Sequence, residues 1–238
     1  GMINSPSLWH EFASREQFNQ AVMQRLADTL QSASLSQKNV LLGVSGGSTP
    51  MPIYQALAQK ELAWNRVKLL LVDERWVPNN NADSNERNIR EAFSANPHAE
   101  KNIIGLWSDT INLDAAAIAA DQKLATMNEV MDVVVLGMGE DGHFASLFPT
   151  SLNFNAAISI HGSRFVLPIS PMPKHALHLR LSMSLAYIQR ARRIILAITG
   201  EKKRSVLRQA IAERDEQQLP IAALFKANSP AVEIYWSN

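Results

Sequence analysis

Four short apolar runs rich in β-branched residues constrain the fold of this chain more than any other feature. They occupy residues 39–45, 67–73, 132–138 and 192–199, and charged side chains fall mainly at their ends. Nearly continuous apolar runs of this length are typical of strands buried on both faces of a parallel sheet. The sequence therefore predicts a sheet with helices on both sides.

Helix-length segments with apolar residues at helical spacing separate these runs. Their ranges are 14–31, 50–60, 84–93, 114–128, 182–191 and 201–213. Strands alternating with helices imply right-handed βαβ units. We predict an α/β fold, a Rossmann-like doubly wound and mainly parallel sheet flanked by helices. A chain of 238 residues suits one such domain, expected over residues 2–238, with Gly1 read as a cloning remnant.

Composition excludes several classes of protein. The 23 basic and 22 acidic residues nearly cancel, which argues against a nucleic-acid partner because phosphate neutralisation needs an excess of Lys and Arg. The absence of cysteine excludes disulfides, thiolate metal sites and a cysteine nucleophile. No apolar run reaches the length of a membrane span, and the start lacks a secretory signal pattern. We expect a cytoplasmic monomer without membrane contact.

Ligands of doubly wound sheets bind outside the carboxyl ends of the strands. The first segment in that position is SGGSTP, with Gly46, Gly47, Ser48 and Thr49 before a proline at a helix start. Free backbone N–H groups and small hydroxyls at a helix N-terminus favour a phosphate. A simple capped turn is the plainer alternative. A rival interpretation is a serine-hydrolase elbow, since GVSGG fits G-x-S-x-G and would make Ser45 the nucleophile.

The second strand end is DERWVP, with Asp73, Glu74 and Arg75. A surface salt-bridge group would explain it, but its position at the mouth of the crevice favours a function. There Arg75 would bind an anionic substrate through its planar guanidinium. Asp73 or Glu74 would orient neighbouring groups.

The third strand end contains a G-x-G-x-x-G pattern, formed by residues 137–142. A dinucleotide site is disfavoured because Glu140 and Asp141 would repel a pyrophosphate, and no acidic residue follows at the spacing that binds a ribose. His143 follows directly, with Asp141 two residues earlier. A histidine can accept a proton at neutral pH, so we predict that His143 is a general base with Asp141 beside it.

No Asp or Glu occurs between Gly142 and Gly200, whereas Arg and Lys are frequent there. This asymmetry points to an acidic substrate. Alternation in HLRLSM places His178, Arg180 and Ser182 on one face of a strand, which makes Arg180 a candidate ligand contact. His175 and His178 lack a third metal ligand, and we predict no metal site.

The motifs together resemble the 6-phosphogluconolactonase family, which shares its fold with glucosamine-6-phosphate deaminases and isomerases. They are GVSGGSTP, LVDERWVP with SNERN, LGMGEDGHFASLFP, RLSMSL and ARRIILAITGEKK, which together extend over nearly the whole chain. The resemblance implies that His143 activates water. It also implies a sugar-phosphate site made by Gly46, Gly47, Ser48, Thr49, Asp73, Arg75, Arg180 and Lys202, with Lys203 as the alternative lysine.

The resemblance implies a cofactor-free hydrolase that opens a phosphorylated sugar lactone, 6-phosphogluconolactone, in the pentose phosphate pathway. Two alternatives stay open. A deaminase or isomerase of the same fold has an acidic residue shortly after its histidine, where this chain reads ASLFP. A non-catalytic sugar-phosphate sensor would keep the phosphate site alone.

Overall fold

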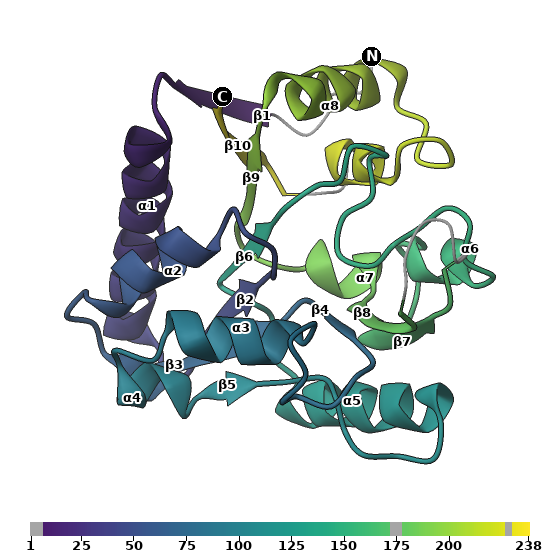
Figure 1. Cartoon of the computed structure of the whole chain (residues 1–238), viewed down its shortest axis with the longest axis horizontal. Coiled ribbons are helices and arrows are strands. Elements are labelled where there is room, and N and C mark those ends of the chain that lie inside the picture. Colours follow the sequence, from purple (N-terminus) through teal and green to yellow (C-terminus); the bar gives the residue numbers. More distant parts are fainter. Residues whose placement is uncertain (1–6, 172–177, 227–229) are drawn as a thin grey trace.

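A seven-stranded parallel sheet forms the centre of the computed structural model, which describes residues 7–171, 178–226 and 230–238 (Figure 1). The strand order is β1-β10-β9-β6-β2-β3-β5, and every neighbouring pair is parallel. The strands are β1 (Ser7–Phe12), β2 (Val40–Val44), β3 (Val67–Leu71), β5 (Ile103–Ile104), β6 (Val133–Leu136), β9 (Ile194–Thr199) and β10 (Val232–Ser237).

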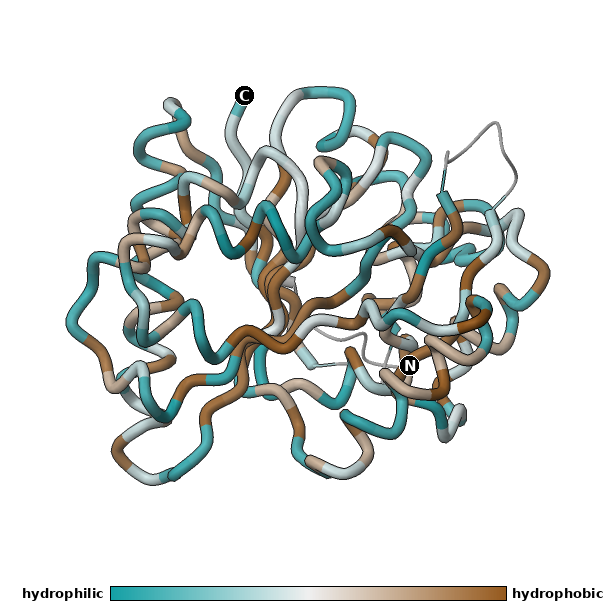
Figure 2. The backbone as a smooth tube through the Cα atoms, turned by 60° about the horizontal axis from the view of Figure 1, so that its bottom comes forward, coloured by the Kyte–Doolittle hydropathy of each residue, from teal (hydrophilic) through white to brown (hydrophobic). Residues whose placement is uncertain are grey.

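Helices cover both faces of this sheet, since every residue of β2 and β6 is buried. They are α1 (Arg15–Ser36), α2 (Met51–Ala58), α3 (Asn85–Ala92), α4 (Pro97–Glu100), α5 (Leu113–Met127), α6 (Phe154–Ala157), α7 (Leu185–Ile188) and α8 (Glu201–Glu213), with 3-10 turns at Trp64–Arg66 and Pro220–Phe225. Hydrophobic residues concentrate along the strands in the middle of the molecule (Figure 2). Among the described residues, no helix combines the length and apolar character needed to cross a bilayer.

A second sheet of three antiparallel strands lies beside the first. It consists of β4 (Asp73–Arg75), β8 (Arg180–Met183) and β7 (Val166–Ile169), in that order. In the β4–β8 pair, Asp73 lies opposite Ser182 and Arg75 opposite Arg180. Two arginines far apart in sequence therefore become cross-strand neighbours.

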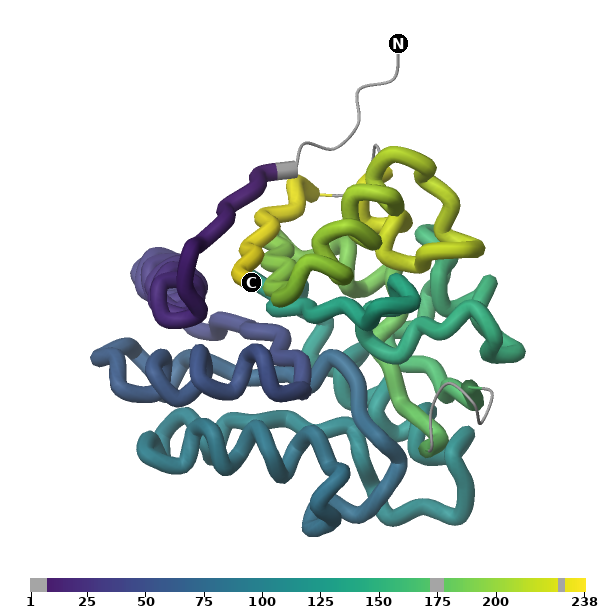
Figure 3. Tube along the Cα trace, turned by 45° about the horizontal axis from the view of Figure 1, so that its top comes forward, coloured from purple at the N-terminus to yellow at the C-terminus, as the bar shows by residue number. Residues whose placement is uncertain are grey.

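The structure confirms the predicted α/β fold class, and the four apolar runs are β2, β3, β6 and β9. Two parts of the prediction were incomplete. Strands β1, β4, β5, β7 and β10 were not among the predicted strands. Of these, β1 and β10 pair along their whole length and place residues 7–12 beside residues 232–237 (Figure 3). The helix predicted over 182–191 is only Leu185–Ile188, because the residues before it pair as β8.

The order of the strands reverses between β2 and β6. From β2 the chain proceeds to β3 and β5 on one side, whereas β6 is followed by β9 and β10 on the other. The carboxyl ends of β2 and β6 thus lie side by side, and the connections leave in opposite directions. Such a reversal opens a crevice where ligands bind in doubly wound sheets.

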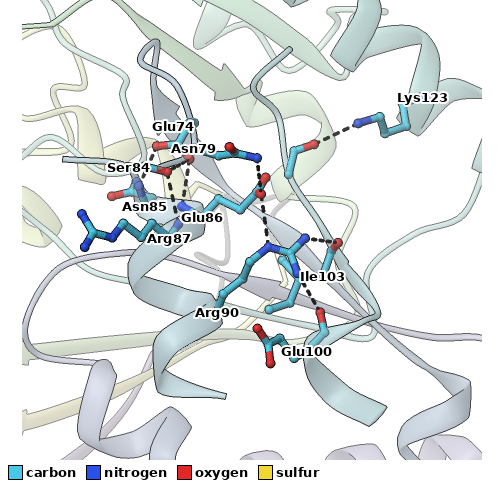
Figure 4. A network of polar contacts seen from close by, with 11 residues as sticks. Glu74, Asn79, Ser84, Asn85, Glu86, Arg87, Arg90, Glu100, Ile103 and Lys123 are labelled. Carbon is cyan, nitrogen blue, oxygen red and sulfur yellow. Dashed lines mark hydrogen bonds and ion pairs between the residues drawn. The ribbon is translucent and has the colours of Figure 1, made fainter. Parts of the chain in front are cut away.

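Glu74 fixes β4 to the N-terminus of α3 (Figure 4). Its carboxylate is fully buried and accepts hydrogen bonds from the backbone N–H groups of Arg75 at 2.8 Å, Asn85 at 2.7 Å and Glu86 at 2.9 Å. The Ser84 hydroxyl donates a fourth at 3.3 Å. The N–H groups of Asn85 and Glu86 belong to the first turn of α3, which leaves such groups without partners inside the helix. Glu74 is therefore a structural residue that sets the position of α3.

Glu86 extends this network away from β4 (Figure 4). One of its carboxylate oxygens accepts from Asn79 Nδ2 at 3.1 Å and from Arg90 Nε at 3.2 Å. Arg90 in turn donates to the carbonyls of Glu100 and Ile103, the latter in β5. The helix is thereby tied to the edge of the main sheet as well as to β4.

The burial of Glu74 gives a pH-dependent stability. Burial raises its pKa from 4.5 to about 7, against the opposing hydrogen bonds from Glu86 and Asn85. The folded protein then binds the Glu74 proton more tightly than the unfolded chain, so this contribution to stability is present at low pH and is lost as the pH rises through about 7. We expect Glu74→Gln to remove this part of the pH dependence.

The measurement is the unfolding free energy of both proteins in urea at pH 5 and pH 8. Between pH 5 and pH 8, the difference in unfolding free energy between the native protein and Glu74→Gln should change by on the order of 3 kcal/mol. The native protein should be relatively more stable at pH 5. The same difference in unfolding free energy at pH 5 and pH 8 would contradict the raised pKa of Glu74.

Candidate active site

A cavity of about 310 Å³ opens at the carboxyl ends of β2 and β6. Its lining comes from the loop after β2, strand β4, the start of α3, the loop after β6, and single residues of β8, β9 and α8. These residues are Ser45, Gly46, Gly47, Ser48, Thr49, Pro50, Asp73, Arg75, Asn85, Gly137, Met138, Gly139, His143, Phe144, Ala145, Arg180, Ala197 and Lys203. The three strand ends singled out from the sequence thus converge on one cavity.

His143 and Asp141 form a hydrogen-bonded pair at one side of the cavity. His143 Nδ1 lies 2.5 Å from Asp141 Oδ1, which also accepts the backbone N–H of His143 at 3.1 Å. Partial burial acts to raise the pKa of Asp141, but the hydrogen bond and charge of His143 outweigh it and hold the pKa below its usual value. An ionised carboxylate at Nδ1 favours the tautomer that leaves Nε2 free as a proton acceptor.

Two glycines of the 137–142 motif make this geometry possible. A Cβ at Gly139 would overlap the imidazole of His143 and the Asp141 carboxylate. Gly142 has φ of +82°, and its N–H closes the turn by donating to the Gly139 carbonyl at 3.0 Å. The motif therefore forms a tight turn that places His143 at the cavity. A residue with a side chain would be strained at the positive φ of Gly142.

The loop after β2 offers hydrogen-bond donors to the cavity. Within the described part of the chain, the backbone N–H groups of Gly46, Gly47, Ser48 and Thr49 have no acceptor. Gly47 has φ of +94°, and helix α2 starts directly after Pro50. Donors grouped at a helix N-terminus form a site for an anion.

Ser45 does not have the geometry of a nucleophile. The Ser45 hydroxyl is buried and donates to the Val135 carbonyl in β6 at 2.7 Å. The backbone carbonyl of Ser45 in turn accepts the Tyr54 hydroxyl at 2.8 Å. Among the described residues no histidine is hydrogen-bonded to Ser45. The G-x-S-x-G match therefore reflects the link between β2 and β6.

Arg75 and Arg180 supply positive charge opposite the glycine loop. The Nε atoms of both are buried without a hydrogen-bond partner among the described residues. Arg75 is held by a bond from Nη1 to the Asp83 carbonyl at 2.9 Å. Burial lowers the pKa of Arg180, Asp73 raises it and the charge of Arg75 lowers it again, with a net decrease. Like charges directly across two strands destabilise a sheet, and an anion between them would remove that cost.

Asp73 is fixed by two residues that the sequence did not single out. Its carboxylate accepts the Ser146 hydroxyl at 2.6 Å, and Asn85 Nδ2 donates to its carbonyl at 3.1 Å. Asn85 also packs against Gly46, where a Cβ would overlap its side-chain amide. Asn85 lies at a helix start and not at the end of a strand of the main sheet. Ser146 lies in the loop after β6 but was not among the residues expected at the site.

The lysine assignment needs a correction. Lys202 is exposed and does not line the cavity, whereas Lys203 does. Both lie in the first turn of α8, where successive side chains are rotated by about 100° around the helix axis. Only one of the two can therefore face the site.

Only one of the two histidines considered for a metal lies in the part of the chain that is described. His178 Nε2 lies 2.9 Å from Asp83 Oδ2, and His175 is outside the described residues. Over the described ranges, no group of three or more His, Asp or Glu side chains is placed to hold an ion.

Comparison with known proteins agrees with this architecture. The family model of glucosamine-6-phosphate isomerases and 6-phosphogluconolactonases matches residues 13–236. A 6-phosphogluconolactonase of Pseudomonas putida is 37% identical over 227 residues, covering 95% of this chain and 91% of the relative. One of Pseudomonas aeruginosa is 38% identical over 212 residues, covering 89% and 87%.

Solved structures show the same relationship. The crystal structure of a 6-phosphogluconolactonase from Shewanella baltica superposes with a TM-score of 0.93 at 34% identity and covers 100% of both chains. A monomeric glucosamine-6-phosphate deaminase shares the fold, with a TM-score of 0.77 at 18% identity over 97% of each chain. With the family model matching nearly from end to end, the chain belongs to the glucosamine-6-phosphate isomerase and 6-phosphogluconolactonase family.

Proposed function

We propose that this protein is a 6-phosphogluconolactonase, a hydrolase that converts 6-phospho-D-glucono-1,5-lactone to 6-phosphogluconate in the oxidative pentose phosphate pathway. Relatives with this name match nearly the whole chain at more than 30% identity. One observation favours this function most: two facing arginines and a row of free N–H groups surround the same cavity as a histidine paired with a carboxylate. Such a site suits a phosphorylated substrate and a proton transfer.

The phosphate group would bind between the glycine loop and the two arginines. Gly46, Gly47, Ser48 and Thr49 provide backbone and hydroxyl donors, and Arg75 and Arg180 provide charge-assisted hydrogen bonds. In place of Lys202, we assign Lys203 to this site. Asp73 would accept a hydrogen bond from a sugar hydroxyl, because its carboxylate lines the cavity.

Hydrolysis would then proceed by general base catalysis. His143 Nε2 removes a proton from water while the water oxygen bonds to the lactone C1 carbon, and the carbonyl oxygen becomes negatively charged. The imidazolium is stabilised and oriented by Asp141 at Nδ1. When the carbonyl re-forms, the bond from C1 to the ring oxygen breaks and this oxygen takes the proton from His143. Donors in the cavity stabilise the intermediate oxyanion.

The remaining expectations from the sequence stay predictions. They are a monomer that acts in the cytoplasm without a cofactor or metal, and a domain that extends over residues 2–238. None of them enters the chemistry proposed here, which needs only the substrate, water and the residues of the cavity.

Replacement of the proposed base tests the mechanism. We expect His143→Ala to lower kcat for 6-phosphogluconolactone about 10²- to 10⁴-fold, because proton transfer in the transition state is lost. Affinity for 6-phosphogluconate should stay close to that of the native protein, since the phosphate contacts remain. The measurement is hydrolysis of freshly generated lactone, with the spontaneous rate subtracted, together with calorimetric titration of 6-phosphogluconate.

Ser45→Ala is the matched control and should keep most of the activity, because the Ser45 hydroxyl bonds to backbone. If Ser45→Ala were inactive and His143→Ala remained active, the result would support a serine nucleophile instead. A native protein that binds 6-phosphogluconate but adds nothing to the spontaneous rate would favour the sensor or deaminase alternatives.

Asp141→Asn tests the orientation of the imidazole. The amide keeps the size of the side chain but offers an N–H group to Nδ1, so Nε2 would carry the proton and no longer accept one. We expect kcat to fall on the order of 10²- to 10⁴-fold with a small change in KM. An unchanged kcat would exclude a role for Asp141 in setting the tautomer.

A further inference from the structure

The ring of Phe148 contacts both side chains on which the proposed chemistry depends, His143 and Arg180. Its centroid lies 4.5 Å from that of the His143 imidazole, with 35° between the ring planes. The guanidinium carbon of Arg180 lies 5.6 Å from the same centroid, over the ring. Phe148 is only 2% exposed and does not line the cavity. It is therefore a shared support behind the two groups and makes no contact with the substrate.

Few hydrogen bonds restrain these two side chains among the described residues. The imidazole has one hydrogen bond, to Asp141, whose side chain is 43% exposed. Arg180 makes no hydrogen bond to another described residue through its guanidinium, and its Nε is buried without a partner. The aromatic face of Phe148 is thus a constraint that both groups share. A guanidinium over an aromatic ring is also attracted to the negative face of the π-system.

We propose that Phe148 is a positioning residue that couples the general base to the phosphate-binding arginine. This proposal rests on the function proposed above and adds a physical link between His143 and Arg180. Movement of the ring displaces His143 from the water and Arg180 from the phosphate together. Loss of the ring would therefore affect kcat through His143 and substrate affinity through Arg180, by separable routes.

Phe148→Leu tests this link, because it removes the flat ring while keeping an apolar side chain. We expect kcat to fall about 10-fold or more, since a small misplacement of a catalytic group is enough for such a loss. Affinity for 6-phosphogluconate should fall about 3- to 10-fold. If the leucine variant folds poorly, Phe148→Met replaces it in the test, because a flexible methionine fills gaps in a core. It should show the same losses of kcat and affinity.

A double-substitution cycle separates positioning from general loss of structure. Arg180→Ala alone should weaken 6-phosphogluconate binding, and adding Phe148→Leu should weaken it little further, because the ring acts on affinity through the arginine. The fall in kcat should persist in the double variant. If the loss of affinity in the double variant equals the product of the two single losses, the coupling to Arg180 is overturned. An unchanged kcat in Phe148→Leu would overturn the coupling to His143.

Phe154→Leu is the matched control, since Phe154 is 3% exposed in α6 and is not part of the cavity lining. It should lower stability without changing kcat or affinity. Equal kinetic losses in both leucine variants would mean that Phe148 contributes only to folding, and would overturn the proposal. The titrations need no turnover, so they test the link to Arg180 even if the native protein fails to hydrolyse the lactone.

Discussion

The close pairing of β2 with β6 is the contact on which the site depends. Gly43 of β2 lies opposite Val134, and a Cβ at this glycine would overlap Val134 and Met131. Glycine at this position leaves the space that the side chains of Val134 and Met131 occupy. The chain then leaves these two strands in opposite directions, so their carboxyl ends share an uncovered space. The glycine loop and the histidine loop face each other as a direct result.

Around that space the protein accumulates unfavourable electrostatics in the absence of a ligand. Two arginines oppose each other on β4 and β8, and backbone donors lack acceptors among the described residues. The largely buried Asp73 offsets only part of the positive charge. The rigid surroundings hold these groups in place, with Glu74 anchoring α3 and Ser146 anchoring Asp73. Binding of a phosphorylated substrate would satisfy all of them with little rearrangement. A preorganised arrangement of this kind favours catalysis because the donors need not reorient during the reaction.

Much of this site was predictable from the sequence because the ends of parallel strands converge. The positions of Gly46–Thr49, Arg75 and His143 follow from that rule, and the strands before them are marked by apolar runs. The supporting residues were not predictable in the same way. Asn85 starts a helix after a loop, and Ser146 and Phe148 act through partners distant in sequence, or through ring contacts that no local pattern reveals. The choice between Lys202 and Lys203 depended on the rotation of α8.

The position of β10 has a consequence for biosynthesis. This strand contains residues 232–237 and lies between β9 and β1, so the N-terminal strand has no partner in the sheet until those residues have been made. During translation the segment Ser7–Phe12, with Trp9 and Phe12, must wait unpaired while more than two hundred residues are added. Strand pairing over such a separation is slow and leaves apolar segments open to aggregation. In the nascent chain this segment therefore stays unpaired until the last strand has been made.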